Sequence, residues 1–270
     1  CDFFVFAGDI NSTFMPMEVI NGPFAQLKKY GSSSKAIIYV RGNHEMRGDY
    51  SDNFLDYFAT NEGTTYDLLR FGDTAFLVLD AWEDKPAKTP GHTYCQWNLD
   101  QVFYEQESAW LDKAMQDEKW LSAKRRIVFC HGAPYSHSDR YKSINTFLQD
   151  LTDNYFAGNN PAHKINLWLT GHVHNYMRSI PGSDEIASPS LPAIPCKDGR
   201  NYSYPVLTVA GPGKREYQAS CYRIDADARG FTLHSWCDKG RLIEHIRYQN
   251  DNSYSEIKSI TRHKVPAENK

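Results

Sequence analysis

Five polar residues in this chain have side chains that could bind a metal ion: Asp9, Asn43, His131, His172 and His174. Four of them stand in short glycine-containing motifs, Gly-Asp at 8–9, Gly-Asn-His-Glu at 42–45 and Gly-His-Val-His at 171–174. Carboxylate and amide oxygens together with neutral imidazole suit Zn, Mn or Fe, whereas a thiolate site or a calcium cage uses other donors. The sequence therefore predicts a site for one of these metals.

Each motif follows a short apolar segment that is typical of a strand buried on both faces. These segments are 3–7, 36–40, 127–130 and 165–169. Sheets of this kind place their ligands just beyond the carboxyl ends of the strands. We therefore expect the five polar residues to converge on one crevice, although a single histidine beside a strand is more often structural.

The rest of the pattern predicts an α/β fold. Further strands are expected at 74–80, 206–210, 220–224, 231–236 and 242–248, and helices at 23–30, 51–59 and 105–120. Strand-helix alternation predicts a layered sandwich. The length of 270 residues fits one large α/β domain, which we place at 1–250, followed by a polar C-terminal tail at 251–270. Cys221 and Cys237 flank a predicted hairpin and are either a cross-strand disulfide or two free thiols.

Charge and hydropathy argue against nonspecific nucleic-acid binding and against a membrane-spanning helix. The net charge is −3, and the 30 basic residues are scattered among 33 acidic ones, which argues against nonspecific nucleic-acid binding. No stretch approaches the roughly 20 apolar residues that a membrane-spanning helix needs. The oligomeric state stays open.

The ordered motifs at Asp9, 42–45, His131 and 171–174 resemble the calcineurin-like metallophosphoesterase superfamily. Segments 106–111, 128–135 and 171–178 are most similar to its purple acid phosphatase branch. The resemblance implies an αββα sandwich of two mixed β-sheets flanked by helices. Because that branch is mostly secreted, it also implies a periplasmic or extracellular location.

The resemblance further implies the activity. Members hydrolyse phosphate esters with a metal-bound hydroxide at a dinuclear centre of divalent or trivalent ions, here Fe, Mn or Zn. Asp9 is expected to bridge the two ions, with Asn43, His131 and His172 completing one site and His174 contributing to the other. His44, directly after a ligand, is the expected catalytic acid for the leaving group.

Two positions depart from the family pattern. The first family motif, Asp-X-His or Asp-X-Gly, is missing because the chain begins at Cys1, eight residues before Asp9, so we expect an N-terminally incomplete record that lacks the first strand or strands. Ser12 stands where purple acid phosphatases carry the tyrosine that gives their colour, so we expect a colourless protein.

The expected substrate is a small phosphorylated molecule, with phosphomonoesters favoured. A phosphodiesterase, or a catalytically dead metal-binding module that lacks the first motif, is the alternative. Five residues near the ligands in sequence are candidate substrate contacts: Arg47, Tyr50, His137, Tyr176 and Arg178.

Overall fold

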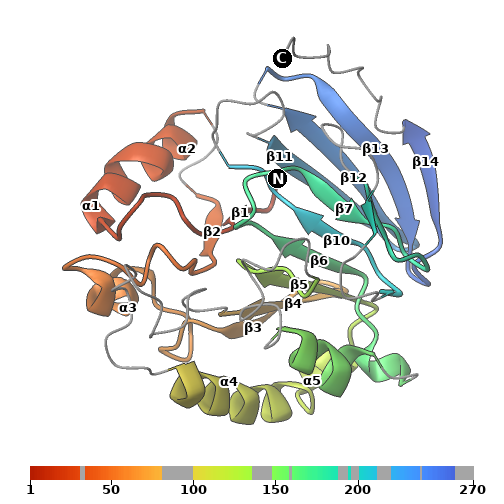
Figure 1. Cartoon of the computed structure of the whole chain (residues 1–270), viewed down its shortest axis with the longest axis horizontal. Coiled ribbons are helices and arrows are strands. Elements are labelled where there is room, and N and C mark those ends of the chain that lie inside the picture. The colour runs from red at the N-terminus through yellow and green to blue at the C-terminus, as the bar shows by residue number, and fades with distance from the viewer. Residues whose placement is uncertain are drawn as a thin grey trace.

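A mixed eight-stranded sheet forms the centre of the protein in a computed structural model, with strand order β3-β4-β5-β6-β10-β7-β8-β9 (Figure 1). The structure describes residues 1–30, 34–80, 100–135, 148–157, 160–187, 194–195, 201–211, 220–237 and 239–258. The central strands are β3 (Asp67–Phe71), β4 (Thr74–Leu79), β5 (Arg125–Cys130), β6 (Leu167–Thr170), β10 (Val206–Thr208), β7 (Met177–Ser179), β8 (Glu185–Ala187) and β9 (Ile194–Pro195). Strands β4, β5, β6 and β10 run parallel, while β3 and β7 pair antiparallel at their flanks.

A second β layer covers one face of this sheet. It consists of a parallel pair, β1 (Phe3–Phe6) with β2 (Ala36–Tyr39), and an antiparallel sheet of β11 (Ser220–Asp227), β12 (Gly230–Cys237), β13 (Leu242–Gln249) and β14 (Tyr254–Lys258). Side chains alternate along buried strands, so Phe76 and Phe129 face this layer and share a core cluster with Leu233 of β12, while Leu77 and Val128 face the opposite side. The predicted α/β sandwich is confirmed, with the second layer divided into two sheets.

Helices lie on the outer side of the central sheet and beside the β1–β2 pair. In Figure 1, α4 (Asp100–Ala114) and α5 (Glu118–Leu121) lie beyond the central sheet, and α1 (Pro16–Val19) and α2 (Ala25–Tyr30) lie on the other side, beside β1 and β2. A π-helical turn, Ile20–Phe24, joins α1 to α2, and its Phe24 stacks on Phe6 with ring centroids 5.2 Å apart. Shorter elements are a 3-10 turn (Ser51–Asn53) leading into α3 (Phe54–Phe58), a π-helical turn (Thr152–Phe156) and a 3-10 turn (Pro161–His163).

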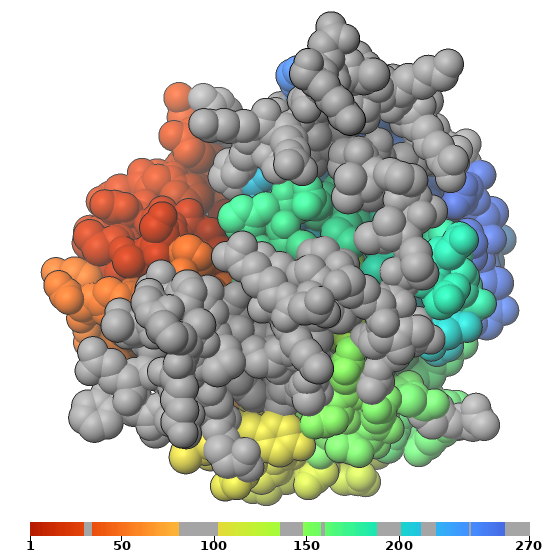
Figure 2. Space-filling view, in the orientation of Figure 1, coloured from red at the N-terminus to blue at the C-terminus, as the bar shows by residue number. Residues whose placement is uncertain are grey.

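The space-filling view shows where the N-terminal, middle and C-terminal parts of the chain reach the surface (Figure 2). The N-terminal residues, red to orange, occupy one side, the yellow and light green helical region forms one edge, and the blue C-terminal strands lie on the opposite side. Among the described residues, none of the helices has the length and apolar character to span a membrane.

Two predicted features differ in the structure, and one alternative that the sequence left open is decided by it. The helix expected at 105–120 is two helices, because Asp117 leaves the helical conformation and its side chain accepts the Lys119 amide N–H at 2.7 Å, which starts α5. Strand β14 lies in the expected C-terminal tail and pairs with β13, so the folded region extends to Lys258. Cys221 and Cys237 are free thiols, because Cys221 pairs with Trp236 and so points to the opposite face from Cys237.

Candidate metal centre

The predicted ligands lie where the parallel strands end. Asp9 follows β1 and Asn43 follows β2, while His131 follows β5 and His172 follows β6. Because β1 and β2 belong to one β layer and β5 and β6 to the other, the four residues face each other across the carboxyl edges of two sheets. The described part of the chain thus brings together one carboxylate, one amide and two imidazoles.

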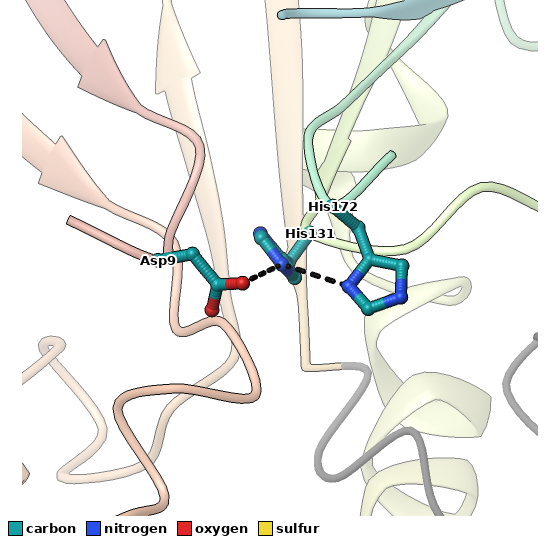
Figure 3. Close-up of side chains that lie close together, drawn as sticks. All are labelled: Asp9, His131 and His172. Carbon is teal, nitrogen blue, oxygen red and sulfur yellow. Dashed lines mark hydrogen bonds and ion pairs between the residues drawn. The ribbon is translucent and has the colours of Figure 1, made fainter. Parts of the chain in front are cut away.

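Ligand atoms of Asp9, His131 and His172 all lie within 4.8 Å of one another, and Figure 3 shows these three side chains pointing together. His131 Nε2 is 3.0 Å from Asp9 Oδ2 and 3.3 Å from His172 Nδ1. His172 Nδ1 is in turn 3.1 Å from Asn43 Oδ1. Oxygen and nitrogen lone pairs that converge in this way fit a divalent cation of the Mn, Fe or Zn type.

The backbone sets the orientation of His131. Its Nδ1 lies 2.5 Å from the Ala7 carbonyl, which can only accept, so Nδ1 carries a proton and Nε2 points to Asp9. Burial by itself would lower the pKa of His131, but the Asp9 carboxylate raises it to about 9. Burial would raise the pKa of Asp9, but His131 and His44 lower it well below its usual range. With this raised pKa, His131 also holds a proton on Nε2 at neutral pH. A metal ion bound at Nε2 would displace that proton.

The backbone around the ligands is strained. Asp9, His172 and His174 have positive φ angles of 54°, 69° and 57°, a left-handed conformation that residues with a Cβ seldom adopt. Such strain persists only where the surrounding structure enforces it, and it clusters at functional sites. The positive φ angles therefore indicate that the loop carrying Asp9 and the loop carrying His172 and His174 are held in place by the surrounding structure.

Glycines let these loops approach one another closely. A Cβ on Gly8 would lie 2.7 Å from both Gly42 N and His131 Nδ1. A Cβ on Gly42 would collide with the Asp9 carboxylate and would lie 2.8 Å from Glu45 Oε2. Both positions thus lack the space for a Cβ, and the positive φ of 82° at Gly8 favours glycine there as well.

Glu45 is a functional residue that the sequence analysis did not single out. Its Oε2 accepts the backbone N–H groups of Asp9 and Gly42, each at 2.8 Å, and its Oε1 accepts that of Ile10 at 3.0 Å and the Tyr39 hydroxyl at 2.7 Å. One buried carboxylate therefore fastens the Asp9 loop to the Asn43 loop. Its place two residues after Asn43 in the Gly-Asn-His-Glu motif was the available signal.

Arg41 connects the two β layers. Its Nε donates to Asp80 Oδ2 at 2.7 Å, joining the segment after β2 to the carboxyl end of β4. The backbone N–H of Asp80 donates to Glu107 Oε1 of α4 at 2.9 Å. This pairing holds the chain immediately before Gly42 and Asn43.

His44 lies at the open edge of the centre, with 29% of its side chain exposed. Its backbone N–H donates to Asp9 Oδ1 at 2.8 Å. Its Nδ1 donates to the Ser12 carbonyl at 2.8 Å, which leaves Nε2 to accept from Arg47 Nη1 at 2.9 Å. The same Nε2 is 3.7 Å from Asp9 Oδ2, so this nitrogen faces the space beside the ligands.

The predicted residues outside this group differ in placement. His174 is exposed and does not join the close group of Asp9, His131 and His172. Arg47 is buried beside His44, Tyr50 is 46% exposed, and His137 lies outside the described residues.

Tyr176 and Arg178 do not fit the predicted substrate contact. Both are buried and point to the β11–β14 sheet, here called the second sheet, where Glu244 accepts hydrogen bonds from each of them. Tyr176, directly before β7, and Arg178, within β7, are two residues apart, so both side chains point to the same side, toward β13. Proximity in sequence to the ligands did not determine this direction.

Comparisons with known proteins identify the family of this chain and a solved structure of similar fold. The profile of the calcineurin-like phosphoesterase family matches residues 1–176. A search of the curated proteins found no match. Among solved structures, the chain is similar in fold to one described as GAP50, the anchor in the inner membrane complex of Plasmodium, with a TM-score of 0.51 and 12% identity over 97% of this chain and 80% of that one. Since the family match spans well over half of the 270 residues, this chain belongs to the calcineurin-like phosphoesterase family.

Proposed function

We propose that this protein is a phosphoesterase that hydrolyses phosphate esters at a metal centre held by Asp9, Asn43, His131 and His172. The observation that carries the proposal is the convergence of these four side chains at the carboxyl ends of strands from two β layers, beside the partly exposed His44. Membership in the calcineurin-like phosphoesterase family supports the same reaction.

The bound metal would supply positive charge for the phosphate oxygens and a water molecule that is acidic enough to react near neutral pH. The chain's own residues hold and orient these groups. Asp9 is fixed by His131 and by the His44 amide, and the exposed edge at His44 is open to a substrate. Phosphoryl transfer asks a protein mainly for such positioning and charge stabilisation.

His44 is proposed to protonate the leaving oxygen. In the structure its Nε2 accepts from Arg47, so donation from Nε2 requires the guanidinium to turn away. A substrate phosphate would attract that guanidinium, because planar guanidinium groups bind phosphate oxygens through paired N–H donors. We therefore propose that Arg47, which contacts His44, also binds the substrate phosphate.

Replacing His44 by glutamine should lower kcat by about 100-fold or more, in line with the loss of a general acid, because no proton donor would stand at the leaving oxygen. Metal content should stay unchanged, since the His44 side chain is outside the ligand group. Turnover of nitrophenyl phosphate and elemental analysis of the same samples would check both. Loss of metal with normal turnover of the reloaded protein would refute the role, and His163→Gln, on a separate 3-10 turn, is the matched control.

We further propose that phosphomonoesters are the preferred substrates, on the basis of the resemblance of segments 128–135 and 171–178 to purple acid phosphatases. Nitrophenyl phosphate should be hydrolysed with a higher kcat/KM than bis(nitrophenyl) phosphate. The opposite order would assign the protein to the phosphodiesterases.

The centre is proposed to be dinuclear, with Asp9 shared by the two ions and His174 serving the second. Elemental analysis after loading with Mn, Fe or Zn should then give two equivalents per chain. One equivalent without hydrolysis would instead favour a metal-binding module, which needs only the four converging donors.

A further inference from the structure

Glu244 is a fully buried carboxylate in the second sheet, and its contacts lie beside the histidine loop of the metal centre. It stands on β13, outside residues 1–176 that match the family. Its Oε2 accepts the Tyr176 hydroxyl, and its two oxygens accept Arg178 Nε at 3.2 and 3.1 Å. Arg178 Nη2 donates to Glu244 Oε1 at 3.1 Å as well.

The contacted residues are close to His174 along the chain. Tyr176 follows it by two residues and Arg178 by four, and Arg178 is in β7, directly after the loop. At the other end of the loop, the Gly171 N–H donates to the His131 carbonyl at 2.9 Å, and the Thr170 hydroxyl donates to the same carbonyl at 2.7 Å. The loop is therefore fixed at its start by β5 and at its end by β13.

This double attachment matters because the loop is strained. His172 and His174 both have positive φ angles, and a loop in that conformation relaxes when its ends are released. Relaxation would move His172 Nδ1 away from Asn43 Oδ1 and His131 Nε2, which it now meets at 3.1 and 3.3 Å.

A purely stabilising role does not require charged groups here. Burying a carboxylate and a guanidinium together costs desolvation energy, and a pair of well-packed apolar side chains is often as stable. Arg178 also reaches Glu256 on β14 at 3.1 Å, so it joins two strands of the second sheet to β7. Directional bonds of this kind define where the attached loop lies.

We propose that Glu244 is a positioning residue for the metal centre, which it serves by holding Tyr176 and Arg178 and thereby the strained loop that carries His172 and His174. The second sheet then helps to hold the metal-binding loop in place. This inference rests on the proposed function, because it presumes that the loop binds metal.

The test measures Mn²⁺ affinity by calorimetry, with metal-free thermal unfolding recorded for every variant. Tyr176→Phe removes one hydroxyl, and the double variant Glu244→Met with Arg178→Met removes both charges without leaving either one buried alone. Both should bind Mn²⁺ about 10-fold more weakly, the lower end of the effect of removing an outer support of a metal ligand. Leu233→Ala, which truncates a fully buried side chain on β12, is the control for lost stability. Its Mn²⁺ affinity should stay within about twofold of that of the unsubstituted protein.

The outcomes separate the two proposals. Unchanged Mn²⁺ affinity in both Tyr176→Phe and the double variant would overturn the positioning role and leave the proposed function standing. An equal loss of affinity in Leu233→Ala would also overturn it, because general destabilisation would then explain the effect. If the unsubstituted protein binds no Mn²⁺, the proposed function and this inference both fail.

Discussion

Replacing His131 by alanine should abolish metal binding and reduce phosphatase activity to the background rate. His131 Nε2 is the atom that contacts both Asp9 Oδ2 and His172 Nδ1, so its removal opens the middle of the donor group. The loss of metal affinity should exceed the roughly 10- to 100-fold effect of removing an outer partner of a ligand. Elemental analysis after Mn loading and turnover of nitrophenyl phosphate would measure it.

The same change should also destabilise the protein. Asp9 has only 9% of its side chain exposed, and the removal of one member of a buried ion pair costs about 3 to 5 kcal/mol. Circular dichroism must therefore show that the variant is folded at the assay temperature. His163→Ala provides a matched histidine change away from the ligands, and retention of full metal content by His131→Ala would contradict the assigned centre.

Replacing Glu45 by glutamine should be nearly as damaging, although the two side chains have the same shape. Both carboxylate oxygens of Glu45 accept hydrogen bonds, and a glutamine amide would point an NH₂ group at backbone N–H donors. Each buried donor left without a partner costs about 1 to 3 kcal/mol. The amide leaves one backbone donor without an acceptor if its NH₂ replaces Oε1 and two if it replaces Oε2, so we expect a loss of about 1 to 3 kcal/mol per donor in the free energy of unfolding, together with weaker metal binding.

Tyr39→Phe is the matched control for this prediction, because it removes a single hydroxyl donor from Glu45 and leaves the three backbone donors in place. Burial and Glu45 raise the pKa of Tyr39, so the hydroxyl is protonated and donates in the native protein. Its loss should cost about 1 kcal/mol. Denaturant unfolding and Mn²⁺ calorimetry of the two variants would compare them, and equal effects would disprove the special role of Glu45.

Strand positions followed from local sequence because buried parallel strands leave a strong local signal. Runs such as 36–40 and 127–130 are apolar and β-branched, and the structure has β2 and β5 there within two residues. The polar residue after each run then identified Asn43 and His131 as candidates. Helix limits were less evident, because the break at Asp117 depends on a capping hydrogen bond that apolar periodicity does not reveal.

The direction of side chains beyond the strand ends required the tertiary structure. Tyr176 and Arg178 stand two and four residues after His174, and Arg47 stands three residues after His44. Tyr176 and Arg178 nevertheless point to Glu244, whereas Arg47 contacts His44. The direction depends on the preceding turn, where His172 and His174 have positive φ angles. The types of the neighbouring residues do not predict these angles. Glu244, 70 residues beyond His174, is found only when β13 is packed against β7.

The candidate metal ligands and their places after strands could be predicted from residue types and local patterns alone, because residue chemistry and strand patterning are both local. Which of these donors meet depends on the packing of distant segments. Asp9 and Asn43 come from one β layer, His131 and His172 from the other, and their contact depends on how two sheets pack. The supporting carboxylates Glu45 and Glu244 likewise act through contacts across distant segments, which the order of residues along a chain does not specify.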